Sequence, residues 1–178
     1  YRITMNGIGN DPVISDCIYD ITSTAAQGTS KVSPDGKYYI YARTEWSLSN
    51  PRGTELYTVN SLTGYLTPVF AFAADDDSFW VNGAEFSANS EYLYLSINQI
   101  LYPPITYHTK VKQFDMSKLN NVDLFESSGV TLYHEESENG FEQMQIGPDG
   151  KIYAAHNLGD NKHMARINYP AKHGIACE

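Results

Sequence analysis

Three stretches of this chain repeat one pattern of polar and apolar positions. In each stretch a short polar turn is followed by a strand that contains tyrosine, and the first two of these strands are rich in it. The stretches are residues 32–42 (VSPDGKYYIYA), 86–96 (FSANSEYLYLS) and 145–155 (QIGPDGKIYAA). In the third stretch Pro148 presets φ, Asp149 caps its own backbone, and Gly150 takes a positive φ without a Cβ clash. The pattern therefore predicts three β-hairpins.

The spacing of these hairpins indicates the architecture. Their turns begin at Ser33, Ser87 and Gly147, so they lie 54 and 60 residues apart. Repeats at such a spacing, built from short strands, are typical of β-propeller blades. Helical periodicity is weak, whereas short alternating or apolar runs predict further strands. We therefore expect an all-β fold: a partial β-propeller of about three four-stranded blades, preceded by an N-terminal strand segment.

The repeats divide the chain into four parts. Residues 30–70 and 71–124 are predicted blades, and residues 125–178 form the last blade and a turn-like tail. Residues 1–29 lack the hairpin pattern, so we interpret them as the tail of a preceding blade or as a lead-in strand that completes the last one. Three blades do not close a ring, and open strand edges invite aggregation. The remaining blades are therefore expected in the same or another chain.

Two details of these blades are also predicted. Residues 98–109 contain a Tyr-Pro-Pro stretch and are expected to form one long loop between strands. A strand at residues 130–134 is assigned to the third unit.

Composition narrows the range of partners. The chain has 178 residues, 14 of them tyrosine, and a formal charge of −9 at pH 7. This charge argues against a nucleic-acid partner and against attraction to anionic membranes, because both need a basic face. No run of about 18 apolar residues occurs, which argues against membrane insertion.

The last hairpin and the tail carry a family resemblance. QIGPDGKIYAA, followed by INYPAKHGIAC at residues 167–177, resembles the C-terminal blades of secreted Bacteroidetes proteins. Those proteins have a WD-repeat-like β-propeller and a gliding-motility-type sorting domain, and they are exported by type IX secretion. VNGAEFSANSEYLYLS and KVKQFDMS resemble the same family, although Ala88-Asn89-Ser90 replaces its Pro-Asp-Gly turn. The resemblance covers about residues 30–178. It implies a secreted or cell-surface propeller and transfers no catalytic residue.

Aromatic residues between the predicted strands are candidate ligand contacts. They are Trp46, Trp80, Tyr102 and Tyr107. Aromatic side chains on one propeller face can stack on sugars or bind a protein partner. The alternative is that they pack between blades.

The acidic run and the two cysteines suggest further sites. Consecutive carboxylates at Asp75, Asp76 and Asp77 are suited to Ca²⁺, which prefers oxygen ligands, but the spacing lacks the pattern of an EF-hand. A solvated loop is the alternative, and no other cofactor is expected.

Cys17 and Cys177 are close to opposite ends of the chain, so they are a candidate disulfide or else two separate thiols.

The five histidines show no helical zinc pattern. They are His108, His134, His156, His163 and His173. His134 precedes Glu135-Glu136, but a zinc site needs ligands that converge from several strands, and a sequence does not show such convergence. No metal is therefore assigned to them.

Catalytic patterns are sparse. No Gly-x-Ser-x-Gly motif is present. Glu45, Glu85 and Glu142 are the candidates for the paired carboxylates of a glycoside hydrolase, and the alternative is that they are carboxylates at the rim.

We expect a non-catalytic extracellular scaffold that binds a protein or glycan partner, within a larger adhesin-like protein. The alternatives are a secreted hydrolase or lyase that acts on polysaccharides, and a structural subunit completed by another chain.

Overall fold

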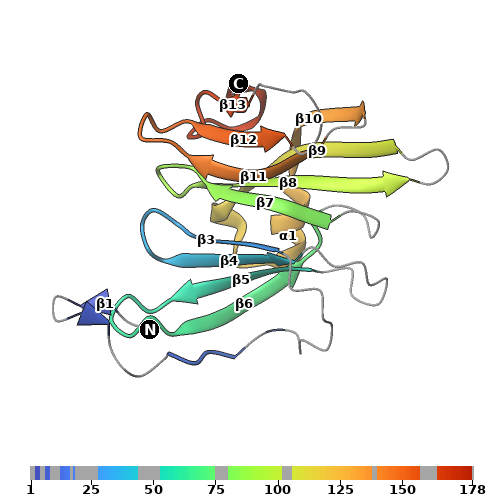
Figure 1. Cartoon of the computed structure of the whole chain (residues 1–178). Helices are drawn as coiled ribbons and strands as arrows, with labels where there is room; N and C mark the ends of the chain where they lie inside the picture. The colour runs from blue at the N-terminus through green and yellow to red at the C-terminus, as the bar shows by residue number, and fades with distance from the viewer. Residues whose placement is uncertain are drawn as a thin grey trace.

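The fold is all-β, as predicted, and consists mainly of three antiparallel sheets (Figure 1). The computed structural model describes residues 3–4, 7–8, 13–16, 18, 28–43, 53–74, 80–101, 106–137, 140–156 and 164–177. Within them the sheets have four, four and three strands, and a separate pair is formed by β1 (Ile3–Thr4) and β2 (Gly7–Ile8).

Each of the three sheets is a meander, in which strands that follow one another along the chain are neighbours. The first sheet contains β3 (Gly28–Val32), β4 (Tyr38–Arg43), β5 (Thr54–Val59) and β6 (Leu66–Phe72). The second contains β7 (Trp80–Phe86), β8 (Tyr92–Leu101), β9 (Thr106–Asp115) and β10 (Val130–Ser137). The third contains β11 (Phe141–Ile146), β12 (Ile152–His156) and β13 (Ala165–Ile167).

Short helices join or end these sheets. A 3₁₀ turn, η1 (Met116–Lys118), and a helix, α1 (Val122–Ser127), connect β9 to β10, and a second 3₁₀ turn, η2 (Gly174–Cys177), ends the described chain. Asn121 begins α1, because its side-chain oxygen accepts a hydrogen bond from the backbone N–H of Leu124 at 3.1 Å. No helix in the described part of the chain combines the length and apolar character needed to cross a bilayer.

The three predicted hairpin turns are confirmed, and each connects the first two strands of a sheet. Ser33 and Ser87 bond the strand beyond the turn in the same way: the backbone N–H of residue i+5 donates to the serine Oγ at 2.9 Å. The backbone φ is +72° at Gly36 and +74° at Gly150, and the second turn reaches +60° with Ser90. The serine therefore takes the left-handed position for which the other two copies use glycine.

The three sheets pack face to face, with the second sheet between the other two (Figure 1). Strand β7 contacts β3 and β4 on one side and β11 on the other. Two apolar clusters fill the spaces between the sheets. The first cluster, between the first and second sheets, includes Phe72, Phe114 and Phe125. The second, between the second and third sheets, includes Tyr94 and Met144.

Two details differ from the sequence prediction. Residues 98–109 are not one long loop, because β8 continues to Leu101 and β9 begins at Thr106, paired with it. Strand β10 belongs to the second sheet rather than to the third unit, because it is hydrogen-bonded to β9. In both cases the hydrogen bonds to a neighbouring strand determine the structure of a segment whose own alternation of polar and apolar residues is weak.

Two residues of the N-terminal segment, Ser15 and Ile18, contact the first sheet. The backbone N–H of Leu66 donates to Ser15 Oγ at 2.9 Å, and the N–H of Ile18 lies 3.3 Å from a Glu55 carboxylate oxygen. These contacts place Ser15 against β6 and Ile18 against β5, and both interpretations of residues 1–29 stay predictions.

Candidate functional site

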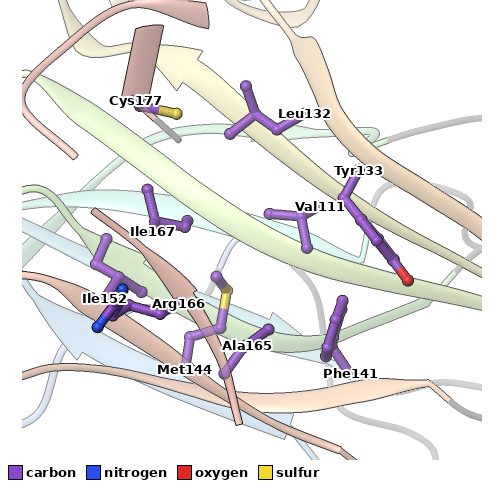
Figure 2. A pocket seen from close by; sticks show the side chains of 11 residues that line it. Val111, Leu132, Tyr133, Phe141, Met144, Ile152, Ala165, Arg166, Ile167 and Cys177 are labelled. Atoms are coloured by element: carbon purple, nitrogen blue, oxygen red, sulfur yellow. The ribbon is translucent and has the colours of Figure 1, made fainter. Parts of the chain in front are cut away.

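An apolar cavity of about 240 Å³ lies between the second and third sheets (Figure 2). It is lined by Val111, Leu132, Tyr133, Phe141, Met144, Ile152, Ala154, Ala165, Arg166, Ile167 and Cys177. These residues come from β9 to β13 and from η2. The cavity is therefore formed by residues 111–177, which the chain brings together from six elements.

Strand length explains why space remains at this position. Strands β9 and β10 have ten and eight residues, whereas β12 and β13 have five and three. Within the described residues, the strands of the third sheet are therefore shorter than the strands of the second sheet that they face. Apolar atoms that line a void lack packing contacts on one side. An apolar group of a ligand that fills the void provides these contacts, so its binding there is favourable.

Two residues with polar side chains border this apolar space. The Tyr133 hydroxyl donates a hydrogen bond to the Glu135 carboxylate, and burial together with this carboxylate raises the pKa of Tyr133 to about 12. Arg166 is exposed and lies opposite Tyr153, so its side chain extends from the face of β13 that points away from Ala165 and Ile167. The interior of the site is therefore mainly apolar.

A buried polar network holds the C-terminal turn against the second sheet. The Tyr94 hydroxyl donates to the carbonyl oxygen of Pro170 at 2.9 Å, and Gln113 Nε2 donates to the carbonyl oxygen of Lys172 at 2.7 Å. The backbone N–H of Gly174 donates to Gln113 Oε1 at 2.7 Å. Burial, with Cys177 nearby, raises the pKa of the Tyr94 hydroxyl well above its ordinary value. The INYPAKHGIAC ending therefore has a structural role: it covers one side of the second cluster.

The first strands of the three sheets are joined by a second polar group, here called the inter-sheet seam (Thr29, Lys31, Glu85, Gln143 and Gln145). Lys31 Nζ lies 3.2 Å from a Glu85 carboxylate oxygen and 2.6 Å from Gln145 Oε1. Thr29 Oγ1 donates to Gln143 Oε1 at 3.1 Å. The seam therefore contains side chains from β3, β7 and β11.

Glu85 is the centre of the seam and was a candidate catalytic carboxylate. It is 3% exposed, and its carboxylate oxygens accept hydrogen bonds from the backbone N–H groups of Phe86 and Ile146, each at 2.9 Å. With Lys31, three groups of the protein bind this carboxylate, which gives it a structural role in joining the sheets. Glu142 lies in β11, and Glu45 lies outside the described residues.

Most of the site residues predicted from sequence fall outside the described part of the chain. These are Trp46, Tyr102, Asp75, Asp76, Asp77 and Cys17, so the loop contacts, the calcium site and the disulfide remain predictions. The backbone of Trp80 begins β7, and that of Tyr107 lies in β9 opposite Ile100, which places Tyr107 in a strand rather than a loop. Cys177 is buried in the second cluster.

One group of possible metal ligands was missed by the sequence analysis. His108, His134 and Glu136 place one ligand atom each within 4.8 Å of one another. The signal that would have found it is the pairing of β9 with β10, which the sequence did not reveal because residues 130–134 were assigned to another unit.

Comparison with protein-family models and with curated proteins finds no match for this chain.

Proposed function

We propose that this chain is part of a non-catalytic β-propeller scaffold that binds a partner outside the cell. One observation carries the proposal. Three successive meanders pack face to face, and their first strands β3, β7 and β11 are neighbours. Each meander begins with a turn whose fourth residue has a positive φ and donates its backbone N–H to the carbonyl oxygen of the first. Consecutive propeller blades have this relation, with the first strand of each blade next to the central channel.

The inter-sheet seam supports the proposal. In a propeller the innermost strands border a channel, where polar side chains meet water and one another. Thr29, Lys31, Gln143 and Gln145 lie on the first strands, and the side chain of Lys31 is 19% exposed. Glu85, on the first strand of the second sheet, links them. These residues would border the channel of the completed ring.

The outer face of the first sheet is where a neighbouring blade would pack. Val32 on β3 is 53% exposed, and Tyr39 lies opposite it on β4. An apolar β-branched residue beside a tyrosine is suited to a sheet-on-sheet contact. Tyr57 on the same face is buried, and its hydroxyl lies 3.3 Å from the N–H of Ile18, so the part of this face at β5 is already covered. The remaining blades would come from the same or another chain.

An extracellular location belongs to the same proposal. It rests on the resemblance of QIGPDGKIYAA and INYPAKHGIAC to secreted Bacteroidetes propellers. The tail of that resemblance packs closely here, since the backbone N–H of Tyr169 donates to the carbonyl oxygen of Cys177 at 2.8 Å. A scaffold of the secreted, type IX-exported class is consistent with such an ending.

The cavity favours a protein partner over a glycan. Sugars bind where polar groups surround a flat aromatic face, whereas this cavity is lined mainly by aliphatic side chains, Phe141 and Met144. The partner we propose is a peptide segment that places one large apolar side chain in the cavity.

Selection of displayed random peptides on the purified chain tests this function. The expected peptides contain a large apolar residue. Their affinity, measured by fluorescence anisotropy, should fall at least tenfold in Ala165→Phe, which fills the cavity. It should stay unchanged in Lys172→Ala, which truncates an exposed side chain elsewhere.

Two results would contradict the proposal. If peptides or glycans bind Ala165→Phe as tightly as the original chain, the cavity is not their binding site. Release of reducing sugars from polysaccharides by the purified chain would favour the hydrolase or lyase.

A further inference from the structure

We infer that His108, His134 and Glu136 form a binding site for a transition-metal ion such as Zn²⁺ on the β9–β10 edge of the second sheet. The three residues come from two strands that are hydrogen-bonded to each other. Their ligand atoms all lie within 4.8 Å of one another. This inference stands independently of the proposed function, because it uses neither the cavity nor the propeller.

Strand register places all three side chains on one face. Glu136 is directly opposite His108, and His134 is opposite Lys110, two residues along each strand. Side chains two apart in a strand share a face, and directly opposed residues share it too. His108, His134 and Glu136 therefore converge without any rearrangement of the backbone.

The distances leave room for an ion after small side-chain rotations. His108 Nε2 is 3.9 Å from Glu136 Oε1, and the two imidazole rings have centroids 5.8 Å apart at an angle of 55°. Tetrahedral zinc bound at about 2.1 Å from each ligand holds its ligand atoms about 3.4 Å apart. A movement of about an ångström at the tips of these side chains closes that difference.

The ligand set selects the kind of ion. Two imidazoles and one carboxylate suit Zn²⁺, Ni²⁺ or Cu²⁺, whereas Ca²⁺ and Mg²⁺ prefer oxygen ligands. Three protein ligands leave a fourth position for water. The Glu136 side chain is 65% exposed and that of His108 is 21% exposed, so solvent reaches the site and the ion can exchange.

The neighbouring residue Glu135 provides a matched control. Successive side chains in a strand point to opposite faces, and the Glu135 carboxylate accepts a hydrogen bond from Tyr133 on the other side of β10. Loss of charge at Glu135 therefore changes the net charge as much as loss at Glu136, without touching the three ligands. His173, which packs beside Tyr92, is the corresponding histidine control.

Zinc titration of the chain, free of any histidine tag, tests the inference by calorimetry and competition with a chromogenic chelator. We expect one saturable site per chain. His108→Gln, His134→Gln and Glu136→Gln should each weaken the affinity at least tenfold, because each removes one of three ligands. Glu135→Gln and His173→Gln should bind zinc as the original chain does.

A second measurement keeps the test independent of folding defects in the variants. An ion that binds only the folded state stabilises it, so zinc should raise the midpoint of thermal unfolding of the original chain and of Glu135→Gln equally, and that of His134→Gln by clearly less. Zinc should also shift the imidazole NMR signals of His108 and His134 while leaving those of His173 in place. Absence of saturable binding, or equal binding by all five variants, would overturn the inference and leave only an ion pair between His108 and Glu136.

Discussion

The two interfaces between sheets use the same kind of strands but pack in different ways. In the first cluster the Phe125 ring from α1 lies 4.9 Å from that of Phe72 and 5.4 Å from that of Phe114, centroid to centroid. The second cluster instead combines a buried tyrosine network with a cavity of about 240 Å³. The difference shows that repeated hairpins do not determine how well the space between them is filled.

The elements between the strands account for this contrast. Helix α1 inserts a large aromatic side chain into the first interface. At the second interface the corresponding cover is η2, which contributes the small side chain of Cys177. Backbones also approach closely there: a Cβ atom at Gly83 would lie 2.0 Å from the carbonyl oxygen of Glu142. The second interface is thus tight at β7 and β11 and open farther along the sheets.

The largest expected effect comes from truncation at the first interface. Phe125→Ala should lower the free energy of unfolding by about 3–5 kcal/mol, because it leaves a void among three other phenylalanines. Met144→Ala, at the second interface, should cost about 2–3 kcal/mol, since Met144 already borders a cavity. Urea unfolding measures both. An equal or larger loss for Met144→Ala would remove the contrast between the interfaces.

Added volume should have effects of opposite sign at the two interfaces. Ala84 is fully buried in the first cluster, so Ala84→Val should destabilise the chain by about 1–3 kcal/mol through overpacking. Ala165 faces the cavity, and Ala165→Leu should stabilise the chain by up to about 1 kcal/mol. Thermal unfolding of Ala84→Val and Ala165→Leu measures both effects. Destabilisation by Ala165→Leu would show that the cavity lacks room for the added carbons.

The smallest effect is a dependence on alkaline pH that belongs to the second interface. Burial raises the pKa of Tyr94 above the ordinary tyrosine value of about 10. Because the pKa is higher in the folded state, the stabilisation is complete below about pH 10 and is lost as the pH rises from there towards the folded pKa. For one such group the free energy of unfolding falls by at most about 1.4 kcal/mol per pH unit.

Tyr94→Phe isolates this contribution. At neutral pH it should cost about 1–3 kcal/mol, because it leaves the carbonyl oxygen of Pro170 without its donor. Between pH 10 and 12 its stability should decline less steeply than that of the original chain. Tyr133, whose pKa is about 12, adds a weaker loss in the same range that both chains share. Parallel slopes for the two chains in urea unfolding series would show that Tyr94 does not titrate with unfolding.

Local patterns predicted the strands and the turns but not their partners. The hydrogen bonds of the Ser33 and Ser87 turns join residues within five positions of one another. A short stretch of sequence is therefore enough to predict these turns. Strand β10 has a weak pattern of its own, and its place beside β9 depends on a pairing that α1 makes possible. The same pairing brings His108 to His134 and Glu136, which is why the candidate metal site was not predicted.

The sequence by itself therefore determined the all-β class, the three hairpins and the strand positions near them, because hydrogen bonds within a turn and alternation along a strand are local effects. Only the tertiary structure decided the membership of β10, the joining of Lys31 to Glu85 and Gln145, and the cavity between the second and third sheets. These features depend on contacts between residues that are tens of positions apart. Their formation is governed by how the faces of whole sheets fit together, which no short stretch of sequence encodes.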